Sequence, residues 1–365
     1  MKRVILSMMI LASLTALAQK KTKIPTERQM AGYVMVYHKD ADHGLHMAYS
    51  WDGYTWTALN DDQPIMAGDT IAVQQGIRDP YIFRNPNDGA FLVAMTDLHV
   101  FGKRDGKRTT EWERDFAKYD WGNNRGLVLA RSTDLIHWNR TNLDFSSLTC
   151  PTGEYDAEGA PIPWTEVGCV WAPEMVYDDV KHQVMMHFTT RFQRGRNHIR
   201  YVYMNDAFDS MTSAPAFLFS AAKDENGNLK SNMIDSDITK IGDTYHLFST
   251  ENGHPRHSTS KNLTGPYVTD YAFNDGVPEV HEAPMLWKLI GQDKWILMQD
   301  RYSMNPHNFY FVETTDMKTF TPLGYFDDGK SPMHRTNFSE QKHGAVVQVT
   351  KKELKRLIKF WSNQR

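Results

Sequence analysis

A short turn signature recurs five times between residues 50 and 320, and it constrains the fold more than any other feature of the sequence. Its clearest copy is Ser132-Thr-Asp-Leu-Ile-His-Trp138. In every copy an aspartate or asparagine closes a strand and a turn follows, and most copies have an aromatic residue or a proline four residues on. Self-similarity of this kind is typical of solenoids and propellers. Five copies predict five units, with the acidic or amide residue at Asp52, Asp134, Asp206, Asn262 and Asp316.

Short apolar runs separated by tight turns precede these signatures. Ala90–Met95 follows the turn Asn85–Gly89, and Thr244–Phe248 follows Gly242-Asp243. Such pairs predict β-hairpins, and helical periodicity is nearly absent before the C-terminus. Four short strands in each of five units predict an all-β fold, a five-bladed β-propeller. A β-sandwich is the alternative, but it does not account for five copies of one turn.

The two ends of the chain complete one another. The first unit begins in mid-blade with strands at 33–37 and 45–49, and the last unit supplies only the strand at 344–349. Pairing these strands in one blade closes the ring without an exposed edge. We expect a propeller domain over 33–350, preceded by a linker at 19–32 and followed by a helix at 351–365. The apolar spacing of that helix predicts that it packs on the propeller rather than on a membrane.

The first 18 residues are typical of a secretory signal peptide. Met1-Lys-Arg precedes an apolar stretch, and Ala16-Leu-Ala18 provides a small-x-small cleavage site. The apolar stretch is too short for a membrane anchor, and no later segment is long enough, so no integral membrane span is expected. We expect an exported bacterial protein, periplasmic or extracellular. A net charge of −3 argues against a nucleic-acid partner, and two cysteines exclude a cysteine metal site.

Carboxylates gather at the predicted starts of the innermost strands, which converge on the axis of a propeller. Like charges held close together raise one another's pKa, which suits acid/base chemistry. A charged insertion at residues 102–124 is too long for a blade loop and predicts a pocket rim or a solvated excursion. The five strand starts are Arg78-Asp79-Pro80, Trp171-Ala-Pro-Glu174, Ile234-Asp235-Ser-Asp237, His281-Glu282-Ala-Pro284 and Lys342-His343-Gly344.

These motifs, in this order, resemble those of glycoside hydrolase family 43. The five-bladed propellers of that family carry an aspartate before a proline, a Trp-Ala-Pro-Asp/Glu segment, an Ile-Asp pair and a Glu-Gly-Pro segment. The resemblance covers roughly residues 33 to 350. Two features differ: Ala283 stands where the family usually has glycine, and the insertion after Phe101 is not a general family feature.

The resemblance implies a role for each carboxylate. Asp79 would be the general base that activates water, Glu282 the general acid, and Asp235 a modulator that keeps Glu282 protonated. Inversion requires the two main carboxyl groups to stand about 6.5–9.5 Å apart. Asp237 remains an alternative modulator, and Asp79 could instead cap a turn.

Further residues are expected to bind substrate. They are Arg78, Trp171, Glu174, His281 and His343. Trp171 could instead belong to the core, and His343 could be a plain turn residue. The family's axial histidine can bind a water or a metal ion, so a structural or active-site cation near His343 stays open, although no cofactor is expected to be required.

The predicted function is therefore hydrolysis of glycosidic bonds in plant-type polysaccharides or oligosaccharides, with a carbohydrate as the only expected partner. The family most often releases L-arabinofuranose or D-xylose. The alternatives are a galactosidase or galactofuranosidase of the same fold, or a propeller that binds carbohydrate without cleaving it.

Overall fold

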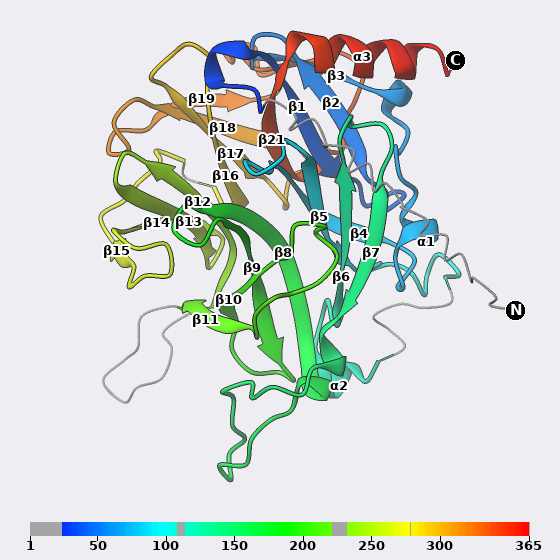
Figure 1. Cartoon of the computed structure of the whole chain (residues 1–365), viewed down its shortest axis with the longest axis vertical. Helices are drawn as coiled ribbons and strands as arrows, with labels where there is room; N and C mark the ends of the chain where they lie inside the picture. Colours follow the sequence, from blue (N-terminus) through cyan, green and yellow to red (C-terminus); the bar gives the residue numbers. More distant parts are fainter. Residues whose placement is uncertain (1–23, 108–113, 221–231, 278, 365) are drawn as a thin grey trace, which may run out of the picture.

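The computed structural model describes residues 24–107, 114–220, 232–277 and 279–364, which form five antiparallel sheets around a common axis (Figure 1). The predicted all-β, five-bladed propeller is thus confirmed. Each blade has four antiparallel strands, which are consecutive in the chain in blades 2 to 5, and the first blade gains a short fifth strand in parallel pairing at its outer edge. None of the helices in these ranges is long and apolar enough to cross a membrane.

Each blade extends from an innermost strand at the axis to an outermost strand at the rim. In that order, blade 1 contains β21 (Lys342–Thr350), β1 (Met30–His38), β2 (His46–Ser50), β3 (Thr55–Ala58) and β20 (His334–Arg335). Blade 2 contains β4 (Ile77–Arg84), β5 (Phe91–Asp97), β6 (Gly126–Ser132) and β7 (Asn139–Asp144). Blade 3 contains β8 (Val167–Asp178), β9 (Gln183–Phe192), β10 (His198–Tyr203) and β11 (Ala216–Phe219).

The last two blades have the same plan. Blade 4 contains β12 (Met233–Ile241), β13 (Thr244–Glu251), β14 (His254–Ser260) and β15 (Val268–Asp270). Blade 5 contains β16 (Glu282–Lys288), β17 (Trp295–Asp300), β18 (Phe309–Thr314) and β19 (Thr321–Tyr325). The α-helices are α1 (Gly68–Ile71), α2 (Phe116–Tyr119) and α3 (Lys351–Ser362).

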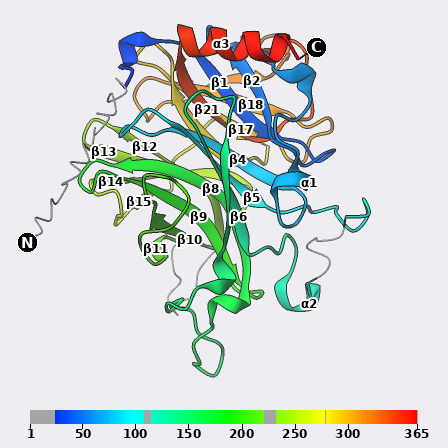
Figure 2. The ribbon, with the colours of Figure 1, turned by 45° about the vertical axis from the view of Figure 1, so that its right-hand side comes forward.

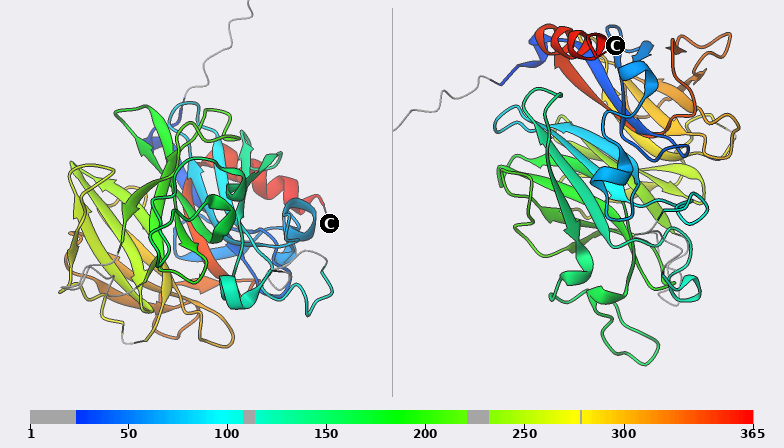
Figure 3. Two further views of the ribbon diagram at one scale, coloured as in Figure 1. Left: turned by 90° about the horizontal axis from the view of Figure 1, so that it is seen from below. Right: turned by 90° about the vertical axis from the view of Figure 1, so that its right-hand side faces the viewer.

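The ring is closed by strands from both ends of the chain, as predicted. In blade 1 the N-terminal β1 pairs with the C-terminal β21, with Tyr33 opposite Gln348. Helix α3, red in Figures 2 and 3, follows β21 directly and lies against blade 1. Its Leu354 and Leu357 are fully buried, and its Glu353 forms an ion pair of 2.8 Å with Arg84 of blade 2.

The recurring turn signature joins the third and fourth strands of every blade. At Asp134 the carboxylate accepts hydrogen bonds from the backbone N–H groups of Ile136 and His137, at 2.9 and 2.8 Å, and from the Ser132 hydroxyl. Asp52 and Asp316 accept the same set of bonds. An aspartate that satisfies two backbone donors in its own turn fixes the turn locally, which is why this motif was readable in the sequence.

A backbone bulge interrupts every innermost strand at the same place. Two strand residues are left without a partner at each bulge, and one of them has a positive φ between 35° and 54°. The five positive-φ residues are Asp79, Ala172, Asp235, Ala283 and His343. Bulges re-aim side chains and occur beside active sites. A left-handed conformation disfavours alanine, so Ala283 occupies a backbone position that suits glycine better.

Each bulge is held by a side chain from the second strand of the preceding blade. That side chain accepts a hydrogen bond from the N–H of the positive-φ residue, at 2.9 to 3.2 Å. The contact therefore links neighbouring blades around the whole ring. In blade order from blade 1 to blade 5, the acceptors are His38, Thr96, Thr189, Thr250 and Asp300.

Candidate active site

A pocket of about 410 Å³, including the open space at its mouth, lies where the bulged strands begin. Most of its wall comes from residues within or next to the five bulges, so the fold gathers residues that are far apart in the chain. The lining residues are Arg78, Asp79, Leu98, Trp121, Trp171, Ile234, Asp235, Glu282 and His343. Six of the eight site residues expected from the sequence are among them.

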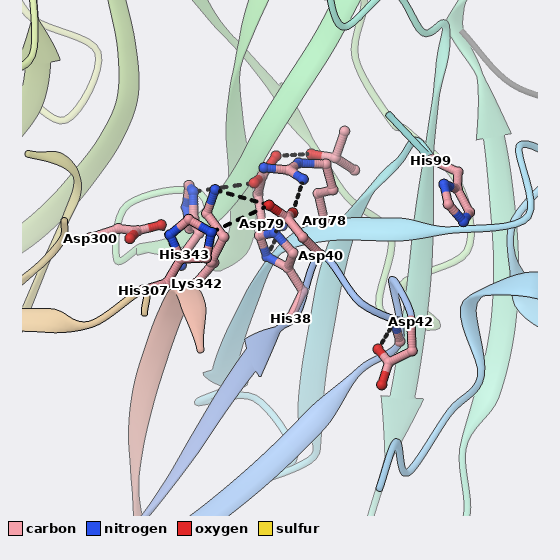
Figure 4. Close-up of polar contacts among 12 residues, drawn as sticks. His38, Asp40, Asp42, Arg78, Asp79, His99, Asp300, His307, Lys342 and His343 are labelled. Carbon is pink, nitrogen blue, oxygen red and sulfur yellow. Dashed lines mark hydrogen bonds and ion pairs between the residues drawn. The ribbon is translucent and has the colours of Figure 1, made fainter. Parts of the chain in front are cut away.

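Asp79 of β4 is held in its ionised form. One carboxylate oxygen lies 3.3 Å from Nδ1 of His343 (Figure 4). The other accepts a 2.8 Å hydrogen bond from the Thr96 hydroxyl. Burial alone would raise the pKa of Asp79, but the His343 and Arg78 charges outweigh it and lower that pKa well below its usual range. In return, Asp79 raises the pKa of His343 to about 9 against the effect of burial. The pair is therefore a carboxylate beside an imidazolium at neutral pH.

The surroundings of Glu282 and Asp235 favour the protonated form of each carboxyl group instead. Burial, followed by the charge of Asp300, raises the pKa of Glu282 to about 7. Burial, together with the charges of Glu282 and Asp79, raises the pKa of Asp235 to about 8 against the effect of His343. The two coupled carboxyl groups therefore hold at least one proton between them at neutral pH. One pocket thus presents an ionised carboxylate and a protonated carboxylic acid, which is the division that general acid/base chemistry needs.

A buried ion-pair network fixes the cation on the pocket wall. Asp40, just after β1, receives a hydrogen bond of 2.5 Å from Arg78 and one of 3.4 Å from Lys342 (Figure 4). These cations lower the pKa of Asp40 to about 2, although burial opposes them. Arg78 is consequently anchored beside Asp79. No sequence pattern pointed to Asp40, because it belongs to none of the strand-start motifs.

Asp235 and Asp237 are separated by the bulge. In a regular strand two residues two apart share a face, but here only Asp235 lines the pocket. The Asp237 carboxylate instead accepts hydrogen bonds from the Tyr81 hydroxyl at 2.9 Å and the Leu286 N–H at 3.0 Å. It thereby ties three blades together, and the geometry favours Asp235 as the residue that acts in the pocket.

Two expected sugar contacts do not reach the pocket. Glu174 is buried and hydrogen-bonded to Asp237, and burial followed by the charges of Asp237 and Asp235 raises its pKa well above the usual range. His281 is fully buried, and its Nδ1 donates to the Glu279 carbonyl at 2.9 Å. Neither residue therefore lines the pocket that contains the other six, and their contact with substrate stays a prediction.

His343 lines the pocket, and its Nδ1 faces Asp79 at 3.3 Å. Among residues 24–107, 114–220, 232–277 and 279–364, no three histidine, cysteine or carboxylate side chains are grouped as metal ligands. A cation near His343 stays a prediction.

Leu98 and Trp121 are pocket residues that sequence reasoning missed. Leu98 directly follows β5, and Trp121 comes from the part of the insertion that follows α2. The insertion was expected to form a pocket rim or a solvated excursion, and its described end forms one wall of the pocket. Residues 108–113 of the insertion lie outside the described ranges.

Comparison with known proteins agrees with this architecture. The model of a glycosyl hydrolase 43-related family, described as a probable glycosyl hydrolase domain, matches residues 28–355. An α-L-arabinofuranosidase of Bifidobacterium longum is 24% identical over 178 residues, which are 47% of this chain and only 14% of that protein. The match to that enzyme therefore concerns about half of this chain and a small part of the other.

Two solved structures share the fold at low sequence identity. An α-L-arabinanase of Cellvibrio cellulosa complexed with arabinohexaose is 14% identical, has a TM-score of 0.52, and matches over 85% of this chain and 96% of its own. A xylan β-1,4-xylosidase of Bacillus halodurans is also 14% identical, has a TM-score of 0.54, and matches over 84% of this chain and 55% of its own. Because the family model spans most of the sequence, the chain belongs to the glycoside hydrolase 43-related family, as the strand-start motifs predicted.

Proposed function

We propose that the protein is an exported glycosidase that cleaves O-glycosidic bonds of plant-type oligosaccharides or polysaccharides with inversion of the anomeric carbon. The observation that carries this proposal is the gathering of three carboxyl groups, Asp79, Asp235 and Glu282, in the wall of one pocket, where His343 and Thr96 hold Asp79 through its two oxygens. A module that only binds sugar gains nothing from burying three carboxyl groups together, because their mutual repulsion costs free energy.

The proposed reaction uses each carboxyl group once. Asp79 accepts a proton from a water molecule, whose oxygen attacks the anomeric carbon. As the bond from that carbon to the leaving oxygen breaks, Glu282 gives its proton to the leaving oxygen. Attack from the opposite side of the ring inverts the anomeric centre. The products are a free sugar and an alcohol, with Asp79 protonated and Glu282 ionised until both exchange protons with water.

Asp235 acts through Glu282 in this scheme. It lies in the same pocket and is buried, so ionisation of Asp235 and Glu282 at the same time is unfavourable. This repulsion holds a proton in the pocket that Glu282 can give to the leaving oxygen. Arg78, anchored by Asp40, provides a fixed cation beside the base.

The proposed sugar is L-arabinofuranose or D-xylose. The compared proteins with arabinofuranosidase, arabinanase and xylosidase names support this choice at the level of the family. A galactoside remains the alternative substrate. Export is proposed from the leader-like N-terminus, which lies outside the described residues. Sequencing the mature N-terminus tests it, with residue 19 as the expected start.

Hydrolysis of a panel of aryl glycosides tests the proposed function. The panel contains α-L-arabinofuranoside, β-D-xyloside, β-D-galactoside and β-D-galactofuranoside. NMR identifies which anomer of the free sugar is released first. We expect cleavage of one pentoside, an inverted product, and loss of turnover in Asp79→Ala and Glu282→Ala. The control is Asp179→Ala, which removes a carboxylate exposed on the surface of blade 3. Absence of cleavage on the panel, on arabinan and on xylan would favour a binding protein instead.

A further inference from the structure

The insertion places one exposed aromatic ring in the wall of the pocket. Trp121 lines the pocket, yet 48% of its surface is exposed. By contrast, Asp235 and His343 in the same wall are only 5% and 7% exposed. Trp121 therefore stands at the mouth, and the acid/base groups lie deeper. Exposing a large apolar ring to water costs free energy unless something covers it.

The backbone that carries Trp121 is fixed by buried side chains. The guanidinium of Arg191, which is itself 9% exposed, donates to the carbonyl oxygens of Tyr119 at 3.0 Å and Trp121 at 2.8 Å. The indole N–H of Trp171 donates to the Gly122 carbonyl at 2.7 Å. Three bonds to successive parts of this segment hold it against β8 and β9, so the ring of Trp121 is presented on a rigid support.

The same segment contains unfavourable backbone geometry. Asp120 has φ 65° and ψ −172°, a region occupied almost only by glycine. Gly122 has φ +67°, and a Cβ there would lie 2.7 Å from the Trp171 ring. Strain of this kind persists only where surrounding contacts enforce it, and it concentrates at ligand sites. Asp120 directly precedes Trp121, so the strain accompanies the placement of that ring, and glycine at position 122 adopts its positive φ without strain.

Trp171 supports Trp121 and is itself covered. The two indoles meet edge to face with centroids 6.0 Å apart, and the Arg191 guanidinium lies over the Trp171 ring at 4.9 Å. Trp171 thus has a cation over its ring and an indole at its edge, whereas Trp121 offers open surface to the pocket. A flat aromatic surface suits the apolar C–H face of a sugar ring.

We propose that Trp121 is a stacking platform for the leaving-group sugar, so that the insertion selects oligosaccharides of two or more sugars. This inference rests on the proposed glycosidase function. The bond that is cleaved must lie at Asp79 and Glu282, deep in the pocket. A chain end that enters as far as these groups places its next sugar at the mouth, beside Trp121.

The test compares two substrates that share the cleaved sugar. One is a trisaccharide of the preferred pentose, and the other is the corresponding glycosyl fluoride, whose leaving group is a single atom. Trp121→Ala should lower kcat/KM for the trisaccharide roughly 10- to 100-fold and leave the fluoride within about twofold. Trp121→Phe should restore most of the activity. The matched control is Trp51→Ala, which removes an indole on blade 1 that is 44% exposed. It should leave kcat/KM unchanged for both substrates.

Several outcomes would overturn the platform. An unchanged trisaccharide rate, or an equal loss on both substrates, would show that Trp121 does not bind the leaving group, while the proposed hydrolysis would stand. If the wild type cleaves neither substrate, calorimetry with the trisaccharide decides. Binding that Trp121→Ala weakens would support the platform although the proposed function fails, and absence of binding to the wild type would overturn both.

Discussion

Asp300 provides the sharpest test of how the pocket keeps its acid protonated. Asp300 on β17 stands directly opposite Glu282 on β16. One of its oxygens accepts a hydrogen bond of 3.1 Å from the backbone N–H of His343, and the other is buried and has no hydrogen-bond partner among the described residues. The other four blades place a neutral threonine or histidine at the equivalent position. Only blade 5 uses a carboxylate there, next to the proposed acid.

The expected effect of Asp300→Asn follows from the charges around Glu282. Burial raises the pKa of Asp300 to about 6, so Asp300 is mostly ionised at pH 7. Its charge is the largest contribution after burial to the pKa of Glu282, about 7. Lys342, His343 and Arg78 act in the opposite direction. Removing one close negative charge should lower the pKa of Glu282 by roughly one unit, or about 1.4 kcal/mol.

The sign of the pH effect is fixed by the role of Glu282. A general acid works only while protonated, so kcat/KM falls as the pH rises through its pKa. Asp300→Asn should therefore shift the high-pH limb of kcat/KM to lower pH by roughly one pH unit. Asp300→Thr, which copies blades 2 to 4, should do the same while keeping an acceptor for the bulge. Asp293→Asn, at a carboxylate 94% exposed, is the control. A limb that stays in place or moves upward would refute the reasoning.

Three further predictions use the same protein. His343→Asn removes the cation that lowers the pKa of Asp79, so a low-pH limb should appear in kcat/KM as Asp79 becomes protonated at accessible pH; a profile unchanged at low pH would contradict this. Asp237→Asn should lower the melting temperature but leave the high-pH limb of kcat/KM in place, because Asp237 bonds to Tyr81 and Leu286 outside the pocket; a shifted limb would make it the modulator after all. Glu353→Ala should cost about 1–3 kcal/mol of unfolding free energy in urea titration, because Arg84 loses both hydrogen bonds to its partner; a cost equal to that of a surface ion pair would contradict it.

The fold was predictable because its repeated parts are local. The turn at Asp134 is held by hydrogen bonds within five residues, so its sequence alone specifies it. Closure of the ring followed from incomplete units at the two ends. The strand starts with Asp79, Asp235 and Glu282 were readable because each belongs to a short motif. Their convergence on one pocket followed from the propeller geometry.

The remaining site features depend on contacts between blades. The bulge in β12 decides that Asp235 faces the pocket and Asp237 does not. Each bulge is fixed by a side chain of the preceding blade, and Asp300 is such a side chain, so no local pattern marks its role. Trp121 is held in the pocket wall by hydrogen bonds from Arg191 and Trp171 to the backbone of the insertion.

The dependence of cleavage on the leaving group tests the assignment of base and acid most directly. The substrates are a dinitrophenyl glycoside, whose leaving oxygen needs no proton, and an alkyl glycoside of the same sugar, whose leaving oxygen does. If Glu282 is the acid and Asp79 the base, Glu282→Ala should still cleave the dinitrophenyl glycoside, but its rate of cleavage of the alkyl glycoside should fall by roughly 100-fold or more. Asp79→Ala should lose cleavage of both glycosides. Cleavage of either substrate by folded Asp79→Ala at near wild-type rate, or equal loss of both in Glu282→Ala, would contradict the account.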